Sequence, residues 1–256
     1  MKVVLFCGGL GMRLREYSET IPKPMVPIGN QPILLYIMRY YAHFGHKEFI
    51  LCLGYRGDVI KRFFLEHNEA MTNNFVMSDG GRRIELENSS IHDWKITFVD
   101  TGIRANIGER LRAVQKYIGE DDIFMATYAD GLTDVPLDEY LAFFRQQDKI
   151  ACLLQVPPSQ TFHVLKTDAN GLVTEISDVR TAVQMNGGFF IFKKELFEYL
   201  REGEDLVAEP FQRLIANRQL VAYRYDGFYG CMDTFKDKQN LEDMLAHGDT
   251  PWIVWE

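Results

Sequence analysis

The chain has 256 residues, of which 46% are hydrophobic, and a formal net charge of −8 at pH 7. This length can bury a sizeable core, and the acidic balance disfavours nucleic acid as a partner, because polyanion binding draws on many Lys and Arg contacts. No apolar run reaches the length of a transmembrane helix and the N-terminus does not resemble a secretory signal, so we expect a cytoplasmic protein that binds no membrane.

Short apolar runs alternate along the chain with segments of helical period, which predicts βαβ units on a mostly parallel sheet. Strands are expected at residues 2–6, 48–53, 96–99 and 123–128, and helices at 33–43, 59–65, 111–118, 140–147 and 206–216. Residues 71–95 have no helical period, and we expect either an antiparallel excursion or a long loop used in subunit contact. With no repeat or linker, the prediction is a single Rossmann-like α/β domain over residues 1–256.

Four cysteines, Cys7, Cys52, Cys152 and Cys231, lie far apart and form no CxxC pair. Three of them fall in apolar, strand-like runs, so buried free thiols are expected. The histidines show no spacing typical of a zinc site.

A glycine-rich turn follows the first predicted strand. Gly8, Gly9 and Gly11 let backbone N–H groups approach an anion, and Arg13 and Lys23 supply positive charge. The turn lacks the spacing of a P-loop, and no acidic residue completes a dinucleotide fingerprint. It therefore predicts another kind of phosphate site, at the carboxyl ends of the strands, where open α/β sheets bind ligands.

The turn resembles the signature of sugar-1-phosphate nucleotidyltransferases, with the sequence GGLGMRL at residues 8–14 followed by PKP at 22–24. Further segments are similar, in order and spacing, to the glucose-1-phosphate cytidylyltransferase branch: GYRG at 54–57, VDTG at 99–102, TYADG at 127–131, NGGFF at 186–190, EP at 209–210, MDT at 232–234 and the terminal residues 251–256. The resemblance implies a nucleotide-diphospho-sugar transferase fold, with residues 155–225 building much of a sugar-side lobe. It also implies formation of a nucleotide-sugar, in this branch a CDP-hexose, with release of pyrophosphate.

Two aspartates are expected to hold a divalent cation. Asp130 follows the apolar run 123–128 and Asp233 lies in a turn, and two such carboxylates suit Mg²⁺, which takes few protein oxygens and completes its shell with phosphates and water. Alone, each aspartate is more often a turn or cap residue. The resemblance favours the metal role, because both positions match metal ligands of the family, and implies Mg²⁺ or Mn²⁺ as the cofactor.

The resemblance assigns the other site residues as well. It implies in-line attack of a sugar-1-phosphate oxygen on the α-phosphorus, with Arg13 stabilising the departing pyrophosphate and Lys23 contacting the α-phosphate. Arg13, Lys23 and Asp130 are the expected catalytic residues. The nucleotide is expected at Gly8, Gly9, Gly11, Met12, Arg13, Lys23, Arg110 and Ala129, and the sugar at His163, Asp178, Asn186 and Gly187.

Departures from the family pattern fall around the phosphates and the sugar. Met12 replaces a threonine, YGC at 229–231 replaces Trp-Gln-Pro, and IGERL at 107–111 replaces Thr-Gly-Gly-Arg-Leu. ISDVR at 176–180 replaces a Glu-Lys-Pro segment whose lysine contacts the sugar phosphate, and Arg180 could substitute only if the loop shifts, since its planar fork differs from an ammonium. His163 replaces a glycine and could contact a sugar hydroxyl, transfer a proton, or be a loop histidine without a role.

These departures leave more than one function open. A nucleotidyltransferase is expected, but the missing lysine also fits a metal-dependent mutase or isomerase that acts on a finished nucleotide-sugar, for example by pyranose–furanose interconversion. A non-catalytic nucleotide-sugar-binding homologue is the third reading. The expected partners are a nucleotide and a sugar phosphate, or a nucleotide-sugar, with a homo-oligomer as a further expectation.

Overall fold

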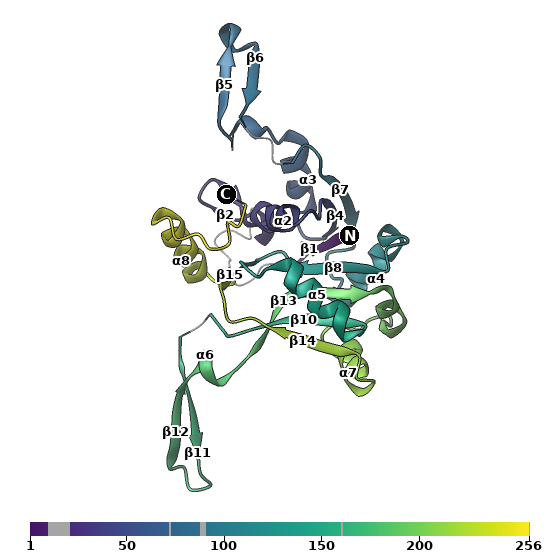
Figure 1. Ribbon diagram of the computed structural model, residues 1–256, viewed down its shortest axis with the longest axis vertical. Coiled ribbons are helices and arrows are strands. Elements are labelled where there is room, and N and C mark those ends of the chain that lie inside the picture. Colours follow the sequence, from purple (N-terminus) through teal and green to yellow (C-terminus); the bar gives the residue numbers. More distant parts are fainter. Residues whose placement is uncertain (10–20, 72, 88–90, 160, 256) are drawn as a thin grey trace.

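The computed structural model describes residues 1–9, 21–71, 73–87, 91–159 and 161–255. A seven-stranded sheet in the order β14-β10-β13-β8-β1-β4-β7 forms the centre of the molecule, with helices on both of its faces (Figure 1). Its neighbouring strands are parallel except where β13 pairs with β8 and β10. The predicted α/β fold with a mostly parallel central sheet is confirmed.

The central strands are β1 (Lys2–Phe6), β4 (Glu48–Leu53), β7 (Lys95–Asp100), β8 (Ile123–Tyr128), β10 (Ala151–Val156), β13 (Met185–Lys193) and β14 (Leu220–Arg224). Two-stranded sheets pair β2 (Pro27–Ile28) with β3 (Gln31–Pro32), β5 (Phe75–Ser78) with β6 (Arg83–Leu86), β9 (Gly131–Thr133) with β15 (Tyr229–Cys231), and β11 (His163–Thr167) with β12 (Val173–Asp178). The helices are α2 (Ile33–His43), α3 (Gly57–Glu66), α4 (Ile107–Ile118), α5 (Leu137–Gln147), α6 (Val179–Ala182), α7 (Glu209–Ala216) and α8 (Phe235–Ala246).

Side chains of β1 alternate between two hydrophobic cores, one on each face of the sheet. Val3 and Leu5 belong to the core that α2, α3 and α5 cover, whereas Val4 and Phe6 belong to the core that α4 and α7 cover. Because both faces are buried, the strand reads as a continuous apolar run in the sequence. The sheet is therefore the middle layer of three.

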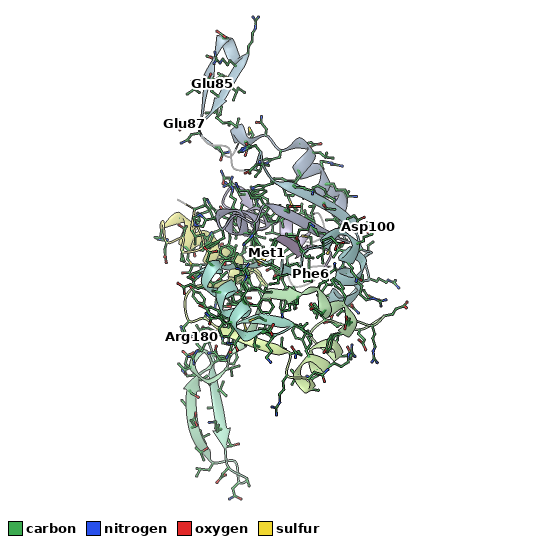
Figure 2. The ribbon with its side chains drawn as sticks, turned by 45° about the vertical axis from the view of Figure 1, so that its right-hand side comes forward. Met1, Phe6, Glu85, Glu87, Asp100 and Arg180 are labelled. Carbon is green, nitrogen blue, oxygen red and sulfur yellow. The ribbon has the colours of Figure 1, made fainter. Side chains whose placement is uncertain are left out.

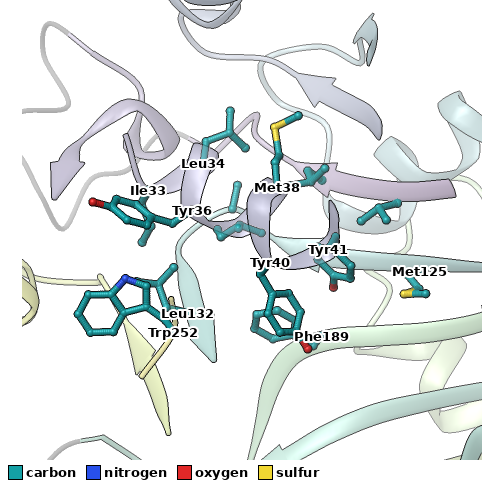
Figure 3. Packing of buried hydrophobic residues seen from close by; sticks show 14 of the residues in the cluster. Ile33, Leu34, Tyr36, Met38, Tyr40, Tyr41, Met125, Leu132, Phe189 and Trp252 are labelled. Atoms are coloured by element: carbon teal, nitrogen blue, oxygen red, sulfur yellow. The ribbon is translucent and has the colours of Figure 1, made fainter. Parts of the chain in front are cut away.

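Aromatic residues of α2 pack into the first core (Figure 3). The ring of Tyr40 meets the ring of Phe189 edge-on at a centroid distance of 6.0 Å, and its hydroxyl donates to the carbonyl of Val135 at 2.7 Å. Tyr36 and Tyr41 are buried as well. These side chains belong to the core.

Local signals explain where helices differ from their predicted bounds. Helix α4 begins at Ile107, earlier than the predicted residue 111, because Asn106 and Glu109 form a reciprocal capping box at its start. Helix α7 begins at Glu209, later than the predicted residue 206, with Pro210 in its first turn. Leu206 is buried ahead of that helix. No helix in the described part of the chain combines the length and apolarity that a membrane span needs.

Two β-hairpins project from opposite ends of the molecule (Figure 1). Hairpin β5–β6 carries Glu85, and Arg180 lies near the base of hairpin β11–β12 at the other end (Figure 2). The first hairpin confirms the antiparallel excursion between residues 71 and 95. Residues 155–225 contribute both to the central sheet, through β13 and β14, and to the second projecting hairpin.

Candidate active site

A cavity of 250 Å³ lies where the central parallel strands end. Phe6 and Tyr128 are the last residues of β1 and β8, and Asn106 follows β7. Ligands of open α/β sheets bind at this edge. The lining residues are Phe6, Gly9, Lys23, Pro24, Ala105, Asn106, Ile107, Arg110, Tyr128, Ala129, Asp130 and Asp205.

Two carboxylates converge on one ammonium at this cavity. Lys23 Nζ donates to Asp130 Oδ2 at 2.5 Å and to Asp233 Oδ1 at 2.5 Å, although Lys23 and Asp233 are 210 residues apart in the sequence. Asp130 comes directly after β8, and Asp233 comes soon after β15, whose pairing with β9 places both carboxylates on the same side. The structure thus brings together three residues that the sequence singled out.

The ammonium of Lys23 stays charged in this setting. Burial lowers the pKa of Lys23, but the charge of Asp130 and the hydrogen bonds to both carboxylates outweigh it, so that the net pKa lies above its ordinary value. Two carboxylates against one ammonium leave a local excess of negative charge. The cluster is therefore suited to a further cation.

The donor atoms of this cluster fit a divalent cation. Oxygens of Asp130 and Asp233 and the sulfur of Cys231 lie within 4.8 Å of one another. Two carboxylate oxygens are the ligands that Mg²⁺ or Mn²⁺ takes, whereas a thiol is foreign to a magnesium shell. Burial and the two neighbouring carboxylates raise the pKa of Cys231, so its thiol is neutral near pH 7.

Arg110 holds the glycine turn in place. Its side chain is buried, and its guanidinium donates to the carbonyl of Gly8 at 3.0 Å, to that of Leu53 at 3.2 Å and to Thr101 Oγ1 at 2.7 Å. A Cβ added to Gly8 would lie 1.9 Å from Arg110 Nη1, whereas a Cβ on Gly9 would have no atom of the described residues within 4 Å. Arg110 borders the cavity, but its guanidinium bonds two backbone carbonyls and the hydroxyl of Thr101, so a direct contact with the nucleotide stays a prediction.

The other predicted nucleotide residues are placed only in part. Gly9 and Ala129 line the cavity. Gly8 is not a lining residue, and its carbonyl accepts a hydrogen bond from Arg110. Gly11, Met12 and Arg13 lie outside the described residues, so their predicted roles rest on the sequence.

Of the predicted sugar residues, Gly187 lies next to Tyr229, which also lies against Gly131 beside Asp130. A Cβ on Gly187 would lie 3.4 Å from the ring of Tyr229, and a Cβ on Gly131, next to Asp130, would lie 3.5 Å from the hydroxyl of the same tyrosine. Asn186 Oδ1 accepts from the backbone N–H of Gly188 at 2.9 Å. Tyr229 thus links the start of β13 to the acidic pair.

His163 and Asp178 are neighbours at the base of the projecting hairpin and do not line the cavity. Asp178 caps α6 and accepts from Arg180 Nε at 3.0 Å and from Arg180 Nη2 at 2.5 Å. The guanidinium considered as a substitute for the family's lysine is thus paired with Asp178. Sugar contacts by His163 and Asp178 stay predictions.

Four further residues of the site were missing from the predicted set: Asn106, Asp205, Tyr229 and Cys231. Asn106 carried a signal, since Asn followed three residues later by Glu is typical of a helix start, and the N-terminus of α4 at the cavity favours anions. Tyr229 and Cys231 fall in the YGC segment that departs from the family pattern, whereas Asp205 had no local signal for the site. Their positions depend on long-range packing.

Comparison with known proteins agrees with this geometry. A family model described as nucleotidyl transferase matches residues 2–237. Over 260 residues, covering all of both chains, the protein is 35% identical to the glucose-1-phosphate cytidylyltransferase of Salmonella typhi, and as similar to that of Salmonella typhimurium strain LT2. A solved UDP-glucose pyrophosphorylase in complex with UDP-glucose matches with a TM-score of 0.70 at 13% identity, over 96% of this chain and 98% of that one. The chain belongs to the nucleotidyl transferase family, and within it to the sugar-1-phosphate nucleotidyltransferases.

Proposed function

We propose that this enzyme transfers a cytidylyl group from CTP to glucose 1-phosphate, forming CDP-glucose and pyrophosphate, with Mg²⁺ or Mn²⁺ held by Asp130 and Asp233. The full-length relatives named glucose-1-phosphate cytidylyltransferase support the base and the sugar. The observation that carries the proposal is the convergence of Asp130, Asp233 and Lys23 beside the cavity.

The residues of the chain supply position and charge for this reaction. Gly9 and the N-terminus of α4, at Asn106 and Ile107, line the cavity, and a helix N-terminus favours the triphosphate. Lys23 keeps the two carboxylates together before the substrates arrive and, being charged, attracts the α-phosphate afterwards. A bound divalent cation would neutralise the negative charge of the phosphates, which otherwise keeps the two substrates apart.

No protein nucleophile is needed for the transfer. A phosphate monoester loses its second proton with a pKa of about 6, so the attacking oxygen of the sugar phosphate is already ionised near pH 7. The attack then forms the new phosphorus–oxygen bond as the bond to pyrophosphate breaks. Positioning of two polyanions is the main task of the protein.

Pyrophosphate release tests the proposal directly. The purified protein is incubated with Mg²⁺, each nucleoside triphosphate and a panel of sugar 1-phosphates, and we expect the CTP and glucose 1-phosphate pair to react fastest. Asp233→Asn should lower kcat/KM on the order of 100-fold, because one charge contact to the transition state contributes about 3 kcal/mol. Asp226→Asn is the matched control, since Asp226 pairs with Arg224 on the surface.

Two results would count against the proposal. Full turnover by Asp130→Asn and Asp233→Asn proteins would remove the acidic pair from the reaction. If the wild-type protein releases no pyrophosphate with any substrate pair but binds a nucleotide-sugar tightly, the result would favour the mutase or the non-catalytic homologue. A new isomer of the bound nucleotide-sugar on chromatography would then identify the mutase.

A further inference from the structure

Cys231 adds a sulfur donor to the acidic pair. We infer that Asp130, Asp233 and Cys231 form a mixed oxygen and sulfur site that binds a soft divalent ion, such as Zn²⁺, Cd²⁺ or Co²⁺, more tightly than Mg²⁺. The three donor atoms lie within 4.8 Å of one another. This inference rests on the proposed cation role of the two aspartates and adds the thiol to it.

The three donors are held on a rigid frame. Cys231 pairs with Gly131 across the β9–β15 ladder, and the N–H of Met232 donates to the carbonyl of Asp130 at 2.8 Å. Met232, between Cys231 and Asp233, is fully buried in the first core. The sulfur and the two carboxylates therefore keep their spacing without a bound ion, which lowers the cost of ordering a site.

A positive charge already lies in this cluster. The ammonium of Lys23 is 2.5 Å from an oxygen of each aspartate, so an incoming ion competes with it for these two oxygens, whereas the sulfur of Cys231 is an additional donor. The hydroxyl of Tyr229 hydrogen-bonds the thiol of Cys231. Such an outer partner orients a sulfur ligand.

The chemistry of the donors separates soft ions from magnesium. Mg²⁺ takes oxygen ligands and gives up its water reluctantly, so the sulfur contributes little to its binding. Zinc, cadmium and cobalt bind thiolate and carboxylate together. When the metal–sulfur bond forms, the thiol proton passes to solvent, so binding releases one proton. Three protein ligands leave fewer positions for phosphate oxygens, and we expect the soft ion to inhibit transfer.

Absorption spectroscopy tests the site without turnover. The purified protein, free of substrate, is titrated with Co²⁺ or Cd²⁺, and we expect thiolate-to-metal charge-transfer absorption that saturates at one equivalent. Cys231→Ser should abolish the band and lower the ratio of Cd²⁺ to Mg²⁺ affinity at least about ten-fold, as expected for loss of a soft ligand. Cys152→Ser is the matched control, because Cys152 is a buried free thiol on β10.

The wild-type protein supplies a readout that does not depend on variants. Bound Cd²⁺ should slow alkylation of Cys231 by iodoacetamide, measured by peptide mass spectrometry. Persistence of the band in folded Cys231→Ser, an unchanged band in Asp130→Asn/Asp233→Asn, or unprotected Cys231 would each overturn the inference. Mg²⁺-dependent pyrophosphate release without a thiolate band would overturn this inference alone, whereas a band in a protein that releases no pyrophosphate would overturn the proposed function alone.

Discussion

Lys23 is placed by a rigid local backbone. Pro22 and Pro24 flank it, and the N–H of Met25 donates to the carbonyl of Pro22 at 2.8 Å, closing a short 3₁₀ turn. Pyrrolidine rings restrict the backbone on both sides of the lysine. The side chain therefore reaches the acidic pair from a fixed base.

Replacement of Lys23 by methionine keeps the length of the side chain and removes its charge. We expect kcat/KM for pyrophosphate release to fall on the order of 100-fold, about 3 kcal/mol, and affinity for Mg²⁺ without substrate to rise, because the carboxylates lose their ammonium. Arginine should not restore activity, since its fork does not replace an ammonium between two carboxylates. Unchanged kinetics in K23M would show that Lys23 acts only in structure.

Among the elements, the turn after β1 depends on α4. Arg110, on α4, donates to the carbonyl of Gly8, and Gly54 leaves room for that carbonyl, since a Cβ there would lie 2.7 Å from it. The guanidinium of Arg110 thus joins α4 to the turn, and a Cβ at Gly8 or Gly54 would lie within 3.0 Å of it. The absence of a side chain at Gly8 is a packing requirement as well as a feature of a phosphate site.

Adjacent glycines give a matched pair of variants for this point. Gly8→Ala should lower the melting temperature by several degrees, because its Cβ would lie 1.9 Å from Arg110 Nη1. Gly9→Ala, whose Cβ would have no neighbour within 4 Å in the described part of the chain, should leave it nearly unchanged. Thermal unfolding followed by circular dichroism measures both. Equal melting temperatures would mean that the Arg110 side chain moves aside at little cost.

The turn between α2 and β4 contains a histidine that responds to pH. Burial lowers the pKa of His46 from 6.5 to about 4, and its Nε2 atom is buried with no hydrogen-bond partner among the described residues. The unfolded chain takes up a proton near pH 6.5 while the folded protein stays neutral to about pH 4. The free energy of unfolding therefore falls as the pH drops through this window.

Urea unfolding at pH 7.5 and pH 5.0 measures the contribution of His46. We expect the wild-type protein to lose on the order of 1 kcal/mol more than His46→Gln between these pH values, after allowance for partial exposure of the ring. Equal losses in both proteins would assign the acid sensitivity to other groups, such as His67, whose pKa burial also lowers.

At the scale of the whole molecule, the projecting hairpin β5–β6 presents an apolar face to solvent. Phe75 opposes Leu86 and Met77 opposes Ile84, so all four side chains lie on one face, and Met77 and Ile84 are 63% and 49% exposed. A lone two-stranded hairpin is marginal in water, and a contiguous apolar patch of this kind is typical of interaction surfaces. We predict that a second copy of the chain covers this face.

Light scattering over a range of protein concentrations tests this homo-oligomer. The wild-type mass should exceed that of the 29.7 kDa chain, and Met77→Glu with Ile84→Lys should shift it toward the monomer. Glu85→Lys, on the opposite face of the same hairpin, is the control for a change of charge. A monomeric wild-type mass at every concentration would contradict the prediction.

Some features followed from the sequence alone because their signals are local. The apolar runs of β1, β4 and β8 and the helical period of α2 marked these elements at their observed bounds, and the glycine turn, Lys23, Asp130 and Asp233 could be named from motifs. The starts of α4 and α7 differed because capping residues and a proline, not the apolar period, decide where a helix begins.

The tertiary structure decided what these residues do together. Pairing of β9 with β15 brings Asp130 and Cys231 side by side and carries Asp233 to Lys23, and no local pattern encodes such a long-range register. Packing gave the Arg110 guanidinium its partners, two backbone carbonyls and the Thr101 hydroxyl. The hairpin placed His163 and Asp178 outside the cavity. Sequence periodicity reports the environment of neighbouring residues, whereas the partners of a charged side chain depend on contacts that only the folded chain makes.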